Sequence, residues 1–113
     1  MPRHCFALDL VDDPNLIAEY EAYHRNGWPE IKTSIIKAGV TNMEIYRTGT
    51  RLFMIMEVTG DFDFDRKEIM DAQNPKVREW EKLMWKYQQA IPWAKPGEKW
   101  VLMNNIYSLN NFI

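Results

Sequence analysis

The chain has 113 residues, of which 46% are hydrophobic, 27% charged and 13% aromatic, and its net charge is -2. This length and balance fit one globular domain over residues 1–113 with one modest core. There is no basic block, so binding to nucleic acid or to an anionic membrane has no electrostatic support.

The short apolar runs and the single cysteine indicate where in the cell the protein is expected. No apolar run approaches the roughly 20 residues needed to cross a bilayer, and the opening segment MPRHCFALDLVDDP has no cleavage-like site. Cys5 is the only cysteine, so no internal disulfide can form and a reducing compartment is expected. We therefore expect a soluble, cytoplasmic protein.

The first third of the chain predicts a strand and two helices. Residues 4–10 alternate in the manner of a strand, and Asp13 then suits a helix N-cap followed by Pro14 at the first helical position. A helical period runs to about residue 25, carried by residues four apart: Leu16, Tyr20 and His24. After the interruption NGWP, residues 29–38 predict a second helix that stops at Gly39.

The rest of the chain predicts three strands and two helices. TNMEIYR and RLFMIMEV are strands joined by the short loop TGT, and a short helix follows within residues 60–75. Residues 75–89 form the clearest amphipathic helix, and KWVLMNNIYSL is the expected last strand. The apolar stripe of that helix contains Val77, Trp80, Met84 and Tyr87.

The order strand, helix, strand, strand, helix, strand predicts an α+β, ferredoxin-like fold. In this plan the helices cover one face of an antiparallel sheet, and the other face needs another cover. Here that face carries Met, Phe, Tyr and Asn side chains. A second copy of the chain is the economical cover, which predicts a homodimer of the dimeric α/β barrel type.

Tyr20 and His24 are the strongest candidates for chemistry, because residues four apart project from one side of a helix. Histidine exchanges protons near neutral pH, and tyrosine is a good hydrogen-bond partner. A half-buried helix edge explains the same spacing, and periodicity alone favours that interpretation. Tyr23 is about 100° round the helix from His24 and is expected to point elsewhere.

Other reactive or aromatic residues carry weaker signals. His4 fits a strand end or an interface, two histidines without metal-ligand spacing predict no metal site, and Cys5 fits a small buried hydrophobe. Tryptophans offer stacking surfaces for a sugar, although Trp80 also fits core packing. Polar strand residues expected near a possible pocket are Asp9, Asn42 and Glu44.

The segments RHCFALDL, EYEAYHRNGWPEI, GVTNMEIYR, LFMIMEV, REWEKLMW and IYSL together resemble the L-rhamnose mutarotase family over nearly the whole chain. The most specific piece is Tyr-x-x-x-His followed by Trp-Pro-Glu, which includes Trp28. The resemblance implies a ferredoxin-like dimer that interconverts the α and β anomers of 6-deoxy-L-sugars. It implies that His24 is the proton donor, that Tyr20 binds the sugar and that Trp80 lines the pocket.

Two positions depart from the rhamnose type, which has a tyrosine at the position of Met43 and a second tryptophan at that of Glu81. The opening segment and the EWE-LMW helix resemble the L-fucose branch more closely, so either sugar is a candidate. Mutarotation needs an acid and a base but no cofactor or metal. Further expected sugar-contacting residues are Trp28, Met43, Glu81, Tyr46 and Asp9. The alternative is a cofactor-free monooxygenase or a small-ligand-binding protein on the same fold.

Overall fold

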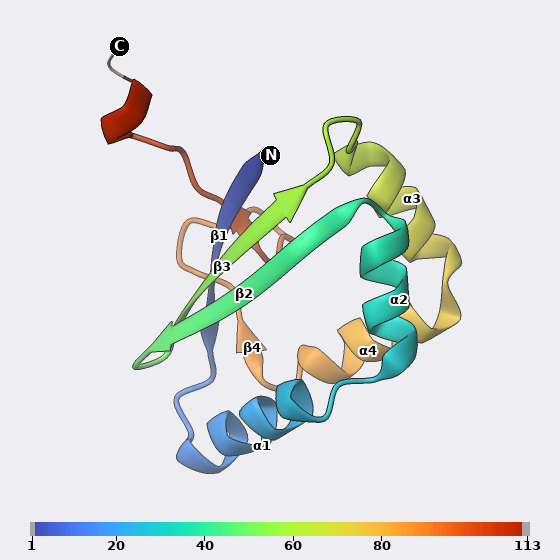
Figure 1. Cartoon of the computed structure of the whole chain (residues 1–113). Helices are drawn as coiled ribbons and strands as arrows, with labels where there is room; N and C mark the ends of the chain where they lie inside the picture. Colours follow the sequence, from blue (N-terminus) through green and yellow to red (C-terminus); the bar gives the residue numbers. More distant parts are fainter. Residues whose placement is uncertain (1, 112–113) are drawn as a thin grey trace.

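The computed structural model describes residues 2–111, in which an antiparallel sheet packs against four helices (Figure 1). The expected ferredoxin-like order is confirmed, and each helical part consists of two helices. The elements are β1 (Arg3–Leu10), α1 (Pro14–Arg25), α2 (Pro29–Lys37), β2 (Val40–Thr48), β3 (Arg51–Val58), α3 (Phe64–Gln73), α4 (Pro75–Met84), β4 (Gln88–Gln89), β5 (Val101–Leu102) and the 3-10 turn η1 (Leu109–Asn111).

Local signals set the ends of the first two helices. The Asp13 side chain accepts hydrogen bonds from the backbone N–H groups of Asn15 and Leu16, at 2.9 and 3.3 Å, and Pro14 opens α1 as expected. Helix α2 is followed by Gly39 at φ +101°, a left-handed conformation that suits glycine. None of the helices within residues 2–111 is long and apolar enough to cross a membrane.

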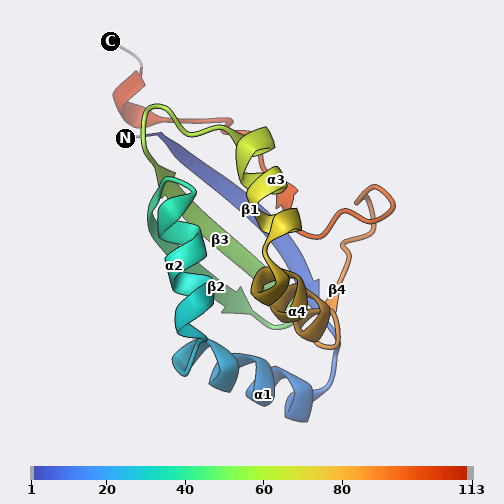
Figure 2. The same cartoon turned by 90° about the vertical axis from the view of Figure 1, so that its right-hand side faces the viewer.

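The sheet has the strand order β2-β3-β1-β4, with β5 also paired to β1, and every pairing is antiparallel. Leu8 lies opposite Leu52 in the register, so their side chains emerge on the same face. Helices α2, α3 and α4 lie in front of that face in Figure 2, while α1 runs along its end. The helices therefore bury one face of the sheet.

The core consists of two adjoining clusters on the helix side of the sheet. Ile45 and Trp100 pack against both and join them into one apolar layer. The buried members of the first cluster are Leu8, Leu10, Tyr20, Leu52, Met84 and Tyr87, and those of the second are Phe6, Val40, Met54, Met56 and Val58.

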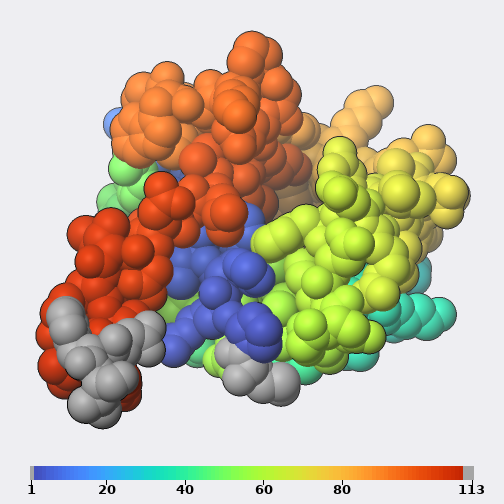
Figure 3. Space-filling view, turned by 90° about the horizontal axis from the view of Figure 1, so that it is seen from above, coloured from blue at the N-terminus to red at the C-terminus, as the bar shows by residue number. Residues whose placement is uncertain are grey.

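The C-terminal part departs from the expected long strand and long helix. Helix α4 ends at Met84 rather than near residue 89, and Gln88–Gln89 then pair with one end of β1. The expected strand over residues 99–109 is reduced to Val101–Leu102. β4 and β5 share the free edge of the eight-residue β1, so little of that edge remains for a long strand. The segment after β5 runs along the outside beside β1 (Figure 3), with Ile106 95% exposed.

Truncating a core residue of β3 should destabilise the fold. Leu52 is 1% exposed, so Leu52→Ala leaves a cavity and should lower the free energy of unfolding by about 2–5 kcal/mol. The matched control is Ile36→Ala on α2, because Ile36 is 70% exposed and its truncation should cost about 0.5 kcal/mol or less. Urea titrations followed by circular dichroism measure both variants. Equal losses would contradict the assignment of the core.

Candidate functional site

The last turn of α1 brings Tyr20 and His24 together. Their ring centroids are 4.4 Å apart, and the His24 Nδ1 lies 2.9 Å from the backbone carbonyl oxygen of Tyr20. A carbonyl oxygen only accepts hydrogen bonds, so Nδ1 is the donor and carries the proton of the neutral ring. Nε2 then bears the lone pair and can accept a proton from a ligand.

Aromatic rings lie beside the imidazole of His24, which belongs to an exposed residue. Trp80 on α4 lies 5.7 Å from it, ring to ring, in an edge-on arrangement, and Trp28 in turn lies 5.1 Å from Trp80. The sequence-predicted residues Tyr20, His24, Trp28 and Trp80 therefore form one cluster. Tyr23, which was expected to point elsewhere, also packs on Trp80 at 6.2 Å. Trp80 on α4 therefore contacts two adjacent residues of α1, Tyr23 and His24.

Gln88 on β4 is a site residue that the sequence did not reveal. Its side chain is buried, with 6% exposed, and its Nε2 donates a hydrogen bond of 3.2 Å to the Tyr20 hydroxyl. Its Oε1 has no hydrogen-bond partner among the residues described. The position fell within the helix expected over residues 75–89, where glutamine is an ordinary surface residue. Only the early end of α4 turns it inward.

Loss of hydration sets the protonation of both site groups. It raises the pKa of Tyr20 to about 12, against the opposing effect of the Gln88 hydrogen bond, so the phenol stays protonated at neutral pH. His24 is an exposed residue, but partial loss of hydration around its ring lowers its pKa below 6.5, and the Tyr20 carbonyl opposes this. The site thus presents a proton donor beside a neutral, proton-accepting imidazole.

Two of the other expected sugar-contacting residues lie on the open face of the sheet, opposite the helices. Tyr46 donates a hydrogen bond of 3.0 Å to Glu44, and Asp9 forms an ion pair with Arg51. Their side chains alternate with the core residues of their strands, so they emerge on the other side of the sheet from His24. Within one chain the structure does not bring them to the aromatic cluster.

The remaining two expected residues lie on the helix side. Met43 is half-buried beside the core cluster that contains Met56. Glu81 is exposed and lines an open cavity of about 500 Å³ against α3, separate from Trp80. Adjacent residues on a helix point about 100° apart, which explains why Trp80 and Glu81 face different surroundings. No group of three or more potential metal ligands occurs within residues 2–111.

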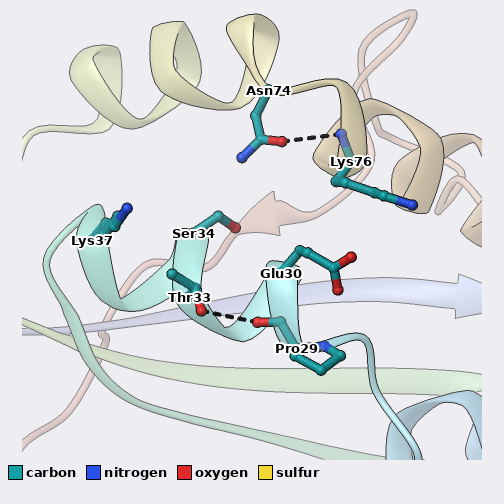
Figure 4. A pocket seen from close by; sticks show the side chains of 7 residues that line it. All are labelled: Pro29, Glu30, Thr33, Ser34, Lys37, Asn74 and Lys76. Atoms are coloured by element: carbon teal, nitrogen blue, oxygen red, sulfur yellow. Dashed lines mark hydrogen bonds between the residues drawn. The ribbon is translucent and has the colours of Figure 1, made fainter.

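A second open cavity, of about 390 Å³, lies between α2 and the start of α4 (Figure 4). It adjoins the aromatic cluster, because Pro29 in its wall directly follows Trp28 and the Lys76 ammonium lies 5.5 Å from the Trp28 ring. Neither Tyr20 nor His24 lines it. Its wall is formed by Pro29, Glu30, Thr33, Ser34, Lys37, Asn74 and Lys76.

Comparison with known proteins identifies relatives over the full chain. The sequence model described as L-rhamnose mutarotase matches residues 3–109. The chain is 44% identical over 115 aligned positions to the L-fucose mutarotase of Xanthomonas campestris, and the alignment covers 100% of this chain and 92% of that relative.

Solved structures share the fold at lower sequence identity. The L-rhamnose mutarotase of Formosa agariphila superposes with a TM-score of 0.71 at 21% identity, covering 96% of this chain and 99% of that one. The tetracenomycin F2 cyclase of Streptomyces glaucescens, a type-II polyketide cyclase, superposes at 0.60 with 18% identity and 96% coverage of both chains. The ferredoxin-like, dimeric α/β barrel class of fold is thereby confirmed, and it hosts more than one chemistry.

His24 should titrate below the ordinary histidine pKa. The reduced hydration of its ring lowers the pKa and outweighs the hydrogen bond to the Tyr20 carbonyl, which raises it, so the midpoint should lie under 6.5. Because Nδ1 donates to that carbonyl, it should carry the proton of the neutral ring. Carbon- and nitrogen-edited NMR across pH 4–9 measures both properties. His4 is the only other histidine, so the spectrum of His24→Gln assigns the signals. A midpoint above 6.5 would contradict the proposed surroundings of the ring.

Proposed function

We propose that this chain, which belongs to the L-rhamnose mutarotase family, interconverts the α and β anomers of L-fucose by opening and reclosing the sugar ring. As a sugar mutarotase it is an isomerase acting on carbohydrates. The observation that carries the mechanism is the pairing of His24 with Tyr20, a neutral base beside a protonated acid.

His24 is the proposed group at the anomeric hydroxyl. Its Nδ1 is engaged by the Tyr20 carbonyl, so Nε2 is the atom that takes the proton from O1. As that proton leaves, the electrons of the O1–H bond form the C1=O1 double bond and the C1–O5 bond of the ring breaks. The lowered pKa of His24 keeps the imidazole neutral at pH 7 and ready to accept.

Tyr20 is the proposed group at the ring oxygen. Its raised pKa keeps the hydroxyl protonated, so it can pass its proton to O5 as the C1–O5 bond breaks. The aldehyde rotates about the C1–C2 bond, and O5 then attacks the opposite face of C1. The same two protons return, one to O1 from His24 and one from O5 to Tyr20, which leaves the enzyme unchanged.

Trp80 and Trp28 are the proposed apolar wall for the sugar. Their rings lie 5.1 Å apart, next to His24, and an indole face suits the C–H surface and the methyl group of a 6-deoxy sugar. Met43 completes the lining from the same side of the sheet in this proposal. Glu81 is left out, because it lines the cavity against α3.

We also propose that two copies of the chain pair through the open face of the sheet. Phe53 and Ile55 are only half-buried there, and Tyr46 is 53% exposed. The C-terminal segment adds further apolar surface, with Ile106 at 95% and Leu109 at 71% exposed. Burying such surface against a second copy is favourable, and Asp9 and Tyr46 then belong to the subunit interface.

Replacing His24 should abolish catalysis while leaving the fold intact. His24→Gln removes the base, and anomeric exchange should slow by about 10²–10⁴-fold. Saturation-transfer NMR between the α and β signals of L-fucose measures the rate. His4→Gln is the matched control, because His4 lies on β1 against the Phe64 ring, 4.8 Å away and outside the cluster. Full activity in His24→Gln would remove His24 from the mechanism.

The same measurement on L-rhamnose tests the choice of sugar. The two sugars differ in hydroxyl configuration, and a site that hydrogen-bonds one pattern leaves polar groups unpaired with the other. We expect exchange of L-fucose to be accelerated at least about 10-fold more strongly than that of L-rhamnose. The reverse order would assign L-rhamnose as substrate. A wild-type protein that accelerates neither sugar would overturn the proposed function.

Size-exclusion chromatography with light scattering tests the dimer. The expected mass is twice the 13.5 kDa of the chain. Ile55→Asp places a charge on the open face and should shift the protein toward monomer, because a buried unpaired carboxylate is unfavourable. Ile36→Asp on the exposed side of α2 should remain dimeric. A wild-type mass of 13.5 kDa at micromolar concentration would overturn the proposal.

A further inference from the structure

The Gln88 side chain is an incompletely satisfied polar group in an apolar layer. The residue is 6% exposed and lies next to the cluster that contains Leu10 and Tyr87. Its Nε2 is bonded to the Tyr20 hydroxyl, whereas its Oε1 is buried without a partner among the residues described. Most buried polar atoms are hydrogen-bonded, so an unpaired one calls for a partner that the described residues do not supply, such as an ordered water or a ligand hydroxyl.

Packing alone does not require an amide at this position. The backbone of Gln88 pairs with Leu10, a role that any residue of a strand performs. A methionine would fill a similar volume and remove the unpaired Oε1, although the Tyr20 hydroxyl would then lose its hydrogen bond from Nε2. Holding the Tyr20 hydroxyl accounts for one end of the amide, but that role leaves the cost of the unpaired other end in the free protein unexplained.

One polar atom of the Gln88 amide is left unpaired in either orientation of the amide. With Nε2 on the Tyr20 hydroxyl, Oε1 is the free acceptor. With the amide reversed, Oε1 would accept the tyrosine proton and Nε2 would be the free donor. Either way, one polar atom remains close to the Tyr20 hydroxyl, because both atoms belong to one amide group. A sugar hydroxyl can pair with either, since it both donates and accepts.

We propose that Gln88 is a sugar-binding residue that links Tyr20 to the substrate. One end of its amide holds the Tyr20 hydroxyl, and the other end binds a hydroxyl on C2, C3 or C4 of the sugar. These hydroxyls keep their places while C1 opens and turns, so a contact with one of them anchors the ring during the reaction. This inference rests on the proposed mutarotase function.

The same hydrogen bond orients the phenol of Tyr20. Because the tyrosine oxygen accepts from Nε2, its own proton is directed away from Gln88. That proton is the one assigned to the ring oxygen of the sugar. Gln88 thereby links the binding of one sugar hydroxyl to the orientation of the Tyr20 proton. Both roles depend on the short strand β4, which pairs with β1.

Gln88→Met tests the contact, and Gln89→Met is its matched control. Gln89 is the exposed neighbour on the same strand, with its side chain on the other face. Anomeric exchange is measured by NMR on wild type and both variants, with L-fucose and its 2-, 3- and 4-deoxy analogues. For L-fucose, Gln88→Met should reduce kcat/KM by about 5- to 50-fold, and Gln89→Met should change it less than about 2-fold.

The deoxy sugars separate a contact from a structural effect. In wild type, removing the hydroxyl that Gln88 binds should reduce kcat/KM, and in Gln88→Met the same removal should have almost no further effect. Equal penalties for every deoxy sugar in both proteins would overturn the inference, with the mutarotase function left standing. If wild type accelerates no sugar, the function itself fails and the inference with it. Should Gln88→Met not fold, Gln88→Asn withdraws the amide by one methylene and enters the same comparison.

Discussion

The burial of Tyr20 is the constraint on which the core and the site both depend. Its ring, 3% exposed, belongs to the larger core cluster, so α1 cannot shift along the sheet without opening that core. Its carbonyl oxygen orients His24 by accepting from Nδ1, and its hydroxyl is held by Gln88. The burial of Tyr20 therefore fixes its own position and that of His24, the two proposed catalytic groups.

The apolar surroundings also set the protonation states of the two proposed catalytic groups. Loss of hydration disfavours charge on any group, so it raises the pKa of a phenol and lowers that of an imidazole. Tyr20 keeps its proton and His24 stays neutral for the same physical reason. A base and an acid are thus available together near neutral pH, and the reaction that we propose needs both. The two shifts come from the burial of Tyr20 in the core and from the partial loss of hydration around the His24 ring, and no nearby charge is needed for either.

The fold by itself leaves the chemistry open, as its likeness to a polyketide cyclase illustrates. What distinguishes this chain is the set of groups on the helix side of the sheet. Two indoles, an imidazole, a buried phenol and a buried amide lie together there, so apolar and hydrogen-bonding groups are combined. Such a mixture suits a 6-deoxy sugar better than a wholly apolar ligand.

Local sequence signals determined much of this protein. The Asp13–Pro14 start, the Gly39 stop and the alternation in β1 and β3 act through neighbouring backbone atoms and solvent, so they can be read without the fold. The four-residue spacing of Tyr20 and His24 is a local signal of the same kind.

Tertiary structure decided the rest. The free edge of β1 is shared by two short strands, which shortened the expected last strand and ended α4 early. That early end turned Gln88 inward, and the alternation of strands put Asp9 and Tyr46 on the opposite face from His24. Both outcomes depend on which distant segments compete for the same edge and face, and no local pattern records that competition.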